Sequence, residues 1–299
     1  MKVPNLPTNL PITRRQFLVT GTCAAAGLGV YSSEIERHWI ELTRRDVVLP
    51  GLSPAFAGLR VVQISDIHLD EFTEPQFLHH AVDRVNELDP DIVLLTGDFV
   101  TSSPISKRVF RSAAWQCAAI LDGLKCRQRY AILGNHDVLV GPEKVTDALR
   151  QHGITLLRNS FMPIERTGGR FWLAGLDDPV VGNPDPGAAI PASIRNVPNE
   201  PVVLLCHAPD YVDNLLTRPE GGSVSLVLSG HTHGGQVRLP LMRPLFLPAF
   251  GQKYVSGWFR FGNLQLHVNR GLGTVGMPFR FLCPPEISLL TLRGAPRAS

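Results

Sequence analysis

The chain has 299 residues, 44% of them hydrophobic, so it is long enough to bury a sizeable core. Its formal net charge of +3 is close to neutral for this length, and no strongly basic segment stands out. Nucleic acid is therefore not favoured as a partner. The five cysteines form no Cys-x-x-Cys pair, which gives no support to a thiolate metal site. They fit small buried side chains better than a disulfide between Cys117 and Cys126.

The N-terminus is typical of an export signal. The residues Thr13-Arg14-Arg15-Gln16-Phe17-Leu18 precede a mild apolar stretch at 19–31 that is rich in glycine and alanine. A basic head followed by a short apolar run is signal-peptide architecture, and the arginine pair resembles the twin-arginine signal. We expect residues 1–35 to be a signal, cleaved near residues 24–26 or kept as an anchor. The protein would then work in the periplasm, at the outer face of the cytoplasmic membrane, or in the cell wall.

Beyond residue 35, apolar runs of strand length alternate with helical patterns. A lead-in strand and linker are expected at 36–57, and a single catalytic domain at 58–294. Runs rich in Val, Ile and Leu predict strands buried on both faces at residues 59–64, 92–95, 130–133, 171–176, 202–205, 224–228, 264–268 and 287–292. This alternation favours an α/β domain with helices outside the sheets.

Three helices are predicted between these strands. The first covers 73–88, with a capping box formed by Thr73 and Gln76 and with Pro75 in its first turn. The second covers 105–124, and the third runs from 142 to 152 and stops at Gly153. Two long segments, 179–201 and 237–257, are dense in proline and read as loops, which are often functional when they are long.

Polar residues with metal-binding chemistry follow five of the predicted strands. The segments are Asp66-Ile67-His68, Gly97-Asp98, Gly134-Asn135-His136-Asp137, His207 and Gly230-His231-Thr232-His233. Ligands of open α/β sheets bind beyond the carboxyl ends of the strands, so these side chains should surround one crevice. In an extended chain, residues two apart such as Asp66 and His68 point to the same side. The glycines at 97, 134 and 230 would let the backbone turn sharply.

The donor types define the class of metal. Imidazole, carboxylate and amide oxygen without thiolate suit Mn²⁺, Fe or Zn²⁺. The seven candidate ligands are too many for one catalytic ion, which must keep an open position, but two bridged ions would use all of them. The candidates are Asp66, His68, Asp98, Asn135, His207, His231 and His233.

This series of motifs resembles the signature of the calcineurin-like metallophosphoesterases over about residues 58–294. The twin-arginine start, residues 230–236, residues 269–273 and residues 284–287 resemble the branch of that family exported from bacteria, which contains phosphodiesterases. The resemblance implies a four-layer α/β/β/α sandwich of two mixed β-sheets flanked by helices. It also implies a hydrolase that uses two divalent metal ions, with Mn²⁺ favoured over Fe or Zn²⁺.

The resemblance assigns roles to the site residues. One ion would be held by Asp66, His68 and His233, and the other by Asn135, His207 and His231, with Asp98 bridging. His136 would donate a proton or contact the substrate phosphate, and Asp137 would orient it. Arg270 is a weaker candidate for substrate binding, with a structural salt bridge as an equal alternative. Asp177 and Asp178 fit a turn better than the site.

We therefore expect a phosphodiesterase in which a metal-bridging hydroxide attacks phosphorus and His136 protonates the leaving oxygen. The alternatives are a phosphomonoesterase or nuclease with the same site, and a non-catalytic binding module on the same fold.

The apolar residues between 239 and 259, with basic neighbours Arg243, Lys253 and Arg260, favour a lipid-linked or cell-envelope substrate, such as UDP-diacylglucosamine, and a peripheral membrane contact. The alternative is that these residues close the core over a sheet. The sequence does not set the oligomeric state.

Overall fold

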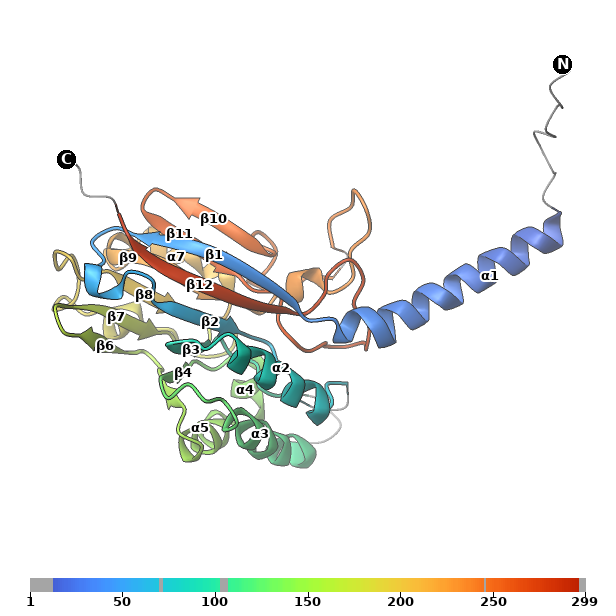
Figure 1. The fold of residues 1–299 in the computed structure, drawn as a ribbon, viewed down its shortest axis with the longest axis horizontal. Helices are drawn as coiled ribbons and strands as arrows, with labels where there is room; N and C mark the ends of the chain where they lie inside the picture. The colour runs from blue at the N-terminus through green and yellow to red at the C-terminus, as the bar shows by residue number, and fades with distance from the viewer. Residues whose placement is uncertain (1–12, 70–71, 103–106, 245, 296–299) are drawn as a thin grey trace, which may run out of the picture.

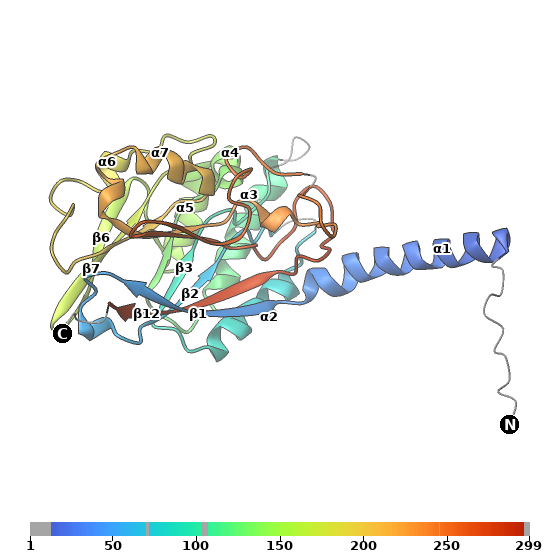
Figure 2. The same ribbon diagram turned by 90° about the horizontal axis from the view of Figure 1, so that it is seen from above.

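The computed structural model describes residues 13–69, 72–102, 107–244 and 246–295. Two six-stranded sheets lie face to face with helices outside them (Figures 1 and 2). The helices are α1 (Arg14–Val30), α2 (Pro75–Glu87), α3 (Lys107–Leu121), α4 (Asn135–Val140), α5 (Pro142–Gln151), α6 (Pro186–Ala189) and α7 (Val212–Leu216).

The first sheet has the order β1-β12-β2-β3-β4-β5, and the second has the order β10-β11-β9-β8-β7-β6. Both sheets are mixed. In the first, β12 pairs antiparallel with β2, while β2, β3, β4 and β5 are mutually parallel. In the second, β10 and β11 and also β6 and β7 pair antiparallel, while the other pairs are parallel. The strands are β1 (Glu41–Leu49), β2 (Arg60–Ile64), β3 (Ile92–Leu95), β4 (Arg129–Ala131), β5 (Thr155–Leu156), β6 (Ser160–Arg166), β7 (Gly169–Gly175), β8 (Val202–Leu205), β9 (Val224–Ser229), β10 (Gly257–Phe261), β11 (Leu264–Val268) and β12 (Glu286–Gly294).

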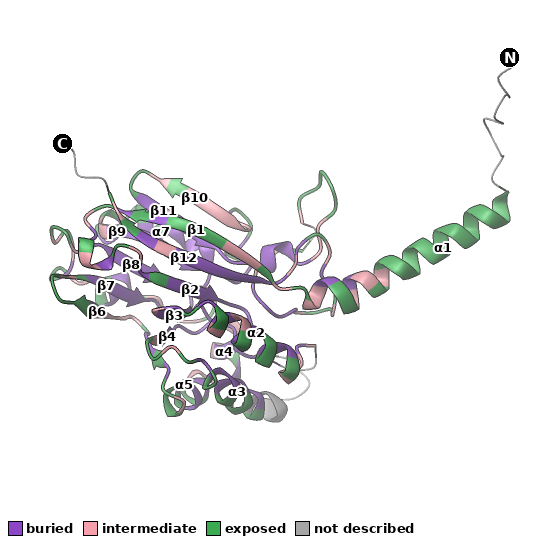
Figure 3. Ribbon diagram, viewed as in Figure 1, coloured by how far each residue is buried: buried purple, intermediate pink, exposed green. Residues whose placement is uncertain are grey.

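Three apolar clusters hold the layers together, and each occupies one gap between layers. Side chains such as Ile92 and Leu228 fill the space between the two sheets. A second cluster packs α2, α3 and α5 against the first sheet, and a third packs α6 and α7 against the second sheet. The strands beside the site are buried on both faces, as Figure 3 shows. The expected four-layer sandwich is therefore confirmed.

Several predicted elements have the expected bounds, while others differ. The strands at 92–95, 202–205 and 264–268 match β3, β8 and β11. The capping box of Thr73 and Gln76 is wrong, because α2 begins at Pro75 and no side chain caps it. Thr73 is buried instead, and its hydroxyl lies beside Gly273. The predicted helix at 105–124 is α3, although residues 105 and 106 lie outside the described residues.

The N-terminal segment lies at one edge of the molecule. Helix α1 starts after a capping box of Thr13 and Gln16 and projects from the domain with no buried residue (Figure 3). No helix in the described part of the chain has both the length and the apolar character needed to cross a bilayer. Strand β1 follows and pairs in parallel with β12 at the edge of the first sheet. All five cysteines are free, and Cys117, Cys206 and Cys283 are buried.

Candidate metal centre

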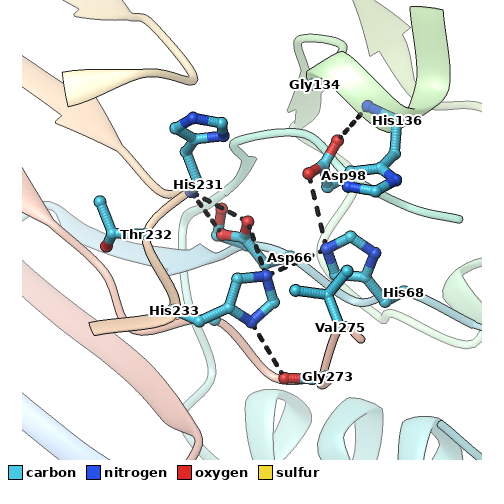
Figure 4. A network of polar contacts seen from close by, with 12 residues as sticks. Asp66, His68, Asp98, Gly134, His136, His231, Thr232, His233, Gly273 and Val275 are labelled. Carbon is cyan, nitrogen blue, oxygen red and sulfur yellow. Dashed lines mark hydrogen bonds and ion pairs between the residues drawn. The ribbon is translucent and has the colours of Figure 1, made fainter. Parts of the chain in front are cut away.

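The five predicted strand ends meet in one place. The loops after β2, β3, β4, β8 and β9 bring their polar side chains together at the carboxyl edges of the two sheets (Figure 4). Donor atoms of Asp66, His68 and His233 all lie within 4.8 Å of one another, and so do those of Asp98, His207 and His231. These two groups contain six of the seven residues expected to bind metal.

The donor atoms face inward at short range. His68 Nε2 lies 3.1 Å from His233 Nε2 and 3.5 Å from Asp98 Oδ2, and His207 Nε2 lies 3.1 Å from the same Oδ2 atom. His233 Nε2 is 3.5 Å from Asp66 Oδ1. Asp98 thus lies between the two groups, in contact with a histidine from each.

The outer nitrogen of each histidine is held by a protein oxygen, which fixes the inner nitrogen. His207 Nδ1 donates to the Thr96 carbonyl at 2.6 Å, and His233 Nδ1 donates to the Gly273 carbonyl at 3.2 Å, so in the neutral form of each ring the lone pair is on Nε2. His231 differs, because its Nε2 donates to the Ala249 carbonyl at 2.7 Å and leaves Nδ1 for the site. His68 Nδ1 lies 2.9 Å from Thr101 Oγ1.

The expectation that Asp66 and His68, and likewise His231 and His233, point to the same side because the chain is extended there is wrong. Asp66, His68, Asp98, His231 and His233 all have left-handed backbone conformations, with φ between 48° and 73°. Such angles are uncommon for residues with a side chain, and they cluster at functional sites. Asp66 and His68 therefore converge through a tight turn after β2 rather than through strand alternation.

Two of the three glycines expected to aid turning serve a different purpose. Gly134 has an extended φ of −101°, but a side chain there would lie 2.2 Å from Asp98 Oδ1. A side chain on Gly230 would lie 1.9 Å from Ser65 Oγ and 2.2 Å from Asp66 Oδ2. Both glycines thus let the backbone approach the carboxylates closely.

Burial and charge together shift the pKa values in the cluster. Burial lowers the pKa of His68 to about 3 and that of His231 to about 4, and it raises the pKa of Asp66 to about 6. Burial opposes the charged forms of His207 and Asp98 as well, but their mutual attraction outweighs it. The pKa of His207 therefore lies well above its usual value, and that of Asp98 lies well below.

The residues fit a pair of divalent cations. Asn135 Oδ1 is buried and has no hydrogen-bond partner among the described residues, so it is a donor atom left free for a ligand. No described lysine or arginine forms an ion pair with Asp66 or Asp98. Buried carboxylates need positive charge close by, and inward-facing imidazole nitrogens beside them form a nitrogen and oxygen donor set for Mn²⁺, Fe or Zn²⁺.

The expected role of Asp137 is not seen. Its carboxylate accepts hydrogen bonds from the backbone N–H groups of Asp98, Phe99, Val100 and Gly134, and it does not contact His136. Burial raises the pKa of Asp137 to about 8. Asp137 is fully buried beneath the loop and holds Asp98 in place.

His136 is instead oriented by Ser102, which the sequence did not single out. The backbone N–H and the Oγ of Ser102 both lie 2.9 Å from His136 Nδ1. An amide can only donate, so Nδ1 carries the lone pair and Nε2 carries the proton of the neutral ring. Ser102 and Thr101 follow β3 in the same loop as Asp98. The position of this loop at the end of a strand is therefore the sequence signal that could have identified them.

The weaker candidates make contacts outside the two groups of donor atoms. Arg270 pairs with Glu286 at 2.9 Å and with Glu41 at 2.8 Å, which corresponds to the salt-bridge alternative. Asp177 pairs with Arg158 at 3.0 Å. Asp178 accepts from two successive backbone N–H groups, those of Val180 and Val181, as expected for a turn.

Comparisons with known proteins identify the family. The family of calcineurin-like phosphoesterases matches residues 59–235. The chain is 32% identical to the uncharacterized metallophosphoesterase YkuE of Bacillus subtilis, over 94% of this chain and 98% of that protein. It is 31% identical to the phosphodiesterase YaeI of Escherichia coli, over 94% and 99%.

More distant relatives extend the comparison. The chain is 28% identical to the UDP-2,3-diacylglucosamine pyrophosphatase LpxG of Chlamydia muridarum, over 87% of this chain and 92% of that protein. A dimetal phosphatase from Danio rerio shares the fold, with a TM-score of 0.50 and 12% identity, over 72% of this chain and 88% of that one. The resemblance inferred from the motifs is thus confirmed: the chain belongs to the calcineurin-like phosphoesterase family and is a metal-dependent phosphoric ester hydrolase.

Proposed function

We propose that this chain is a two-metal phosphodiesterase whose substrate carries an apolar group. The observation that supports it most directly is the cavity in front of the metal centre, of about 540 Å³. Its lining includes the polar residues Asp98, Asn135, His136, His231 and His233 and the apolar residues Phe246, Leu247, Pro248, Val275 and Met277.

The charge of this cavity favours diesters over monoesters. Among the residues whose side chains the structure describes, no lysine or arginine lines it, so these residues offer a phosphate no lysine or arginine contact beside bound metal. A monoester carries close to two negative charges at neutral pH and would gain from further cationic contacts. A diester carries one charge and two substituents, for which the apolar wall offers a place.

The chain's own residues divide the work of hydrolysis. Asp66, His68 and His233 would hold one cation, and Asn135, His207 and His231 the other, with Asp98 between. Such a pair neutralises charge on the phosphoryl oxygens and makes hydroxide available near neutral pH. His136, held by Ser102 with the proton of its neutral ring on Nε2, lines the cavity and would protonate the departing oxygen.

The first test is the choice of substrate by the metal-loaded protein. Chelator-treated protein should be inactive, and Mn²⁺ should restore hydrolysis of bis(p-nitrophenyl) phosphate. The kcat/KM for this diester should exceed that for p-nitrophenyl phosphate by about tenfold or more. Such a ratio corresponds to a difference of about 1.4 kcal/mol or more between the two activation barriers. Preference for the monoester would favour the phosphomonoesterase alternative, and no hydrolysis of either would favour the binding module.

The second test concerns His136. The His136→Ala variant should keep its metal content but lose about 10²–10⁴-fold in kcat for diesters with alkoxide leaving groups, the usual range for a general acid. The loss should be smaller when the leaving group is p-nitrophenolate, which departs without a proton. Equal losses for both leaving groups would contradict the acid role, and reduced metal content would mean that His136 holds the ions.

An apolar rim at the cavity supports the lipid-linked part of the proposal, since two of its six members, Phe246 and Met277, line the cavity. We define the rim as Leu241, Met242, Phe246, Met277, Phe279 and Leu282, which are between 37% and 107% exposed. By contrast, Tyr254, Trp258 and Phe259 pack into the core, so the expected core role holds for that part of the segment. Leu245 lies outside the described residues, and Lys253 is engaged by Asp213 at 2.8 Å.

The rim and α1 lie at the same edge of the molecule (Figures 1 and 2). Tyr31, directly after α1, packs edge-on against Phe281 within the rim segment, with ring centroids 6.5 Å apart. If the arginine pair directs export as proposed, this edge would meet the outer face of a bilayer, with the cavity opening beside it. Fractionation of cells that express the full chain checks this location.

The third test replaces the rim. Leu241→Asn, Met242→Gln and Phe246→Gln together should weaken binding to anionic phospholipid vesicles by about tenfold or more, since each apolar side chain contributes about 1.5–3 kcal/mol when fully buried. Turnover of an acylated diester should fall while that of bis(p-nitrophenyl) phosphate survives. Leu216→Gln, at an exposed apolar position on α7, serves as the control. A parallel loss on both substrates with a lower melting temperature would mean that the rim is structural.

A further inference from the structure

The segment between α1 and β1 is bound tightly to the catalytic domain, although it lies outside the part that matches the family. It consists of a π-helical turn, Tyr31–Ile35, and a 3₁₀ turn, Glu36–His38. Ser32 and Glu36 are buried, and Glu36 is only 3% exposed. Burying a carboxylate costs free energy unless the group is paired or hydrogen-bonded, so its partners matter.

The partners of this segment lie in the loop before β12. The Ser32 carbonyl accepts from the N–H of Arg280 at 3.0 Å, and Glu36 Oε1 accepts from the N–H of Cys283 at 2.6 Å. The second contact joins residues 247 positions apart in the sequence. Arg37 secures the other side of the segment through an ion pair with Glu74 at 2.7 Å and a hydrogen bond to the Phe72 carbonyl.

Both contacted residues lead directly to His233. Cys283 Sγ donates to the His233 carbonyl at 3.3 Å. The buried guanidinium of Arg280 donates to the Gly273 carbonyl at 2.6 Å, and that carbonyl is the one that receives His233 Nδ1–H. One route therefore holds the backbone of His233, and the other holds the oxygen that sets its tautomer.

We propose that Ser32 and Glu36 are positioning residues for the metal centre, which act on His233 through Cys283 and Arg280. The segment 31–38 then belongs to the functional enzyme rather than to the export signal. Groups that orient a metal ligand from behind typically change metal affinity by about 10–100-fold when they are removed. The effect should fall on the ion held by Asp66, His68 and His233, because no described contact of the segment reaches the other group.

The test measures metal binding in the full-length chain and needs no substrate, so its outcome does not depend on the proposed reaction. Glu36→Ala should raise the Kd of one of two Mn²⁺ ions by about 10–100-fold and leave the other unchanged. Electron paramagnetic resonance at limiting Mn²⁺ should then show an isolated ion instead of a coupled pair. Glu36→Gln, which keeps an oxygen that can accept from Cys283, should restore most of the affinity. Glu34→Ala, at an exposed position in the same segment, is the matched control.

A double-mutant cycle of Glu36→Ala and Cys283→Ala tests whether Glu36 acts on His233 through Cys283. The single variant Cys283→Ala still tests the proposal if Glu36→Ala folds poorly. Cys283→Ala removes the thiol contact with His233 but not the N–H that binds Glu36, so it should weaken the same ion. The two changes together should cost less than their sum, because they act along one path. Unchanged affinity for both ions would overturn the proposal. So would equal weakening of both ions with a lower melting temperature, or an equal effect of Glu34→Ala.

Discussion

The structure depends on placing two buried carboxylates, Asp66 and Asp98, beside imidazoles, with no ion pair to a described lysine or arginine. Charged groups taken out of water are costly unless they are paired, and here the attraction between His207 and Asp98 is the largest one that favours the charged form of Asp98. Two divalent cations would balance this arrangement and satisfy the free Asn135 oxygen as well. The rest of the fold delivers these donors to one point.

Holding them requires rigid surroundings. Five residues of the site have strained, left-handed backbone conformations. Such conformations persist only where neighbouring contacts hold them. Such contacts lie behind several of the ligands: backbone carbonyls accept from three histidines, and Asp137 accepts from four amides of the loops that carry Asp98 and Asn135. The buried core between the sheets fixes the strands from which these loops start.

Much of this could be predicted from the sequence because it is local. Runs such as residues 92–95 show buried strands directly, and the polar residues after them mark the edge where ligands bind. The partners of those residues could not be predicted in the same way. Asp137 was expected to orient His136 because it is adjacent in sequence, yet the helical turn of α4 directs it into the interior, and Ser102 takes that role from another loop. The contact between Glu36 and Cys283 depends on packing across the whole chain, and no local pattern signals it.

Anomalous diffraction from crystals grown with Mn²⁺ tests whether the site holds two ions bridged by Asp98. Two anomalous peaks about 3.5–4 Å apart are expected. One should contact Asp66, His68 and His233, the other should contact Asn135, His207 and His231, and an Asp98 oxygen should contact both. A single fully occupied ion, or two ions of which only one contacts Asp98, would contradict a centre bridged by Asp98.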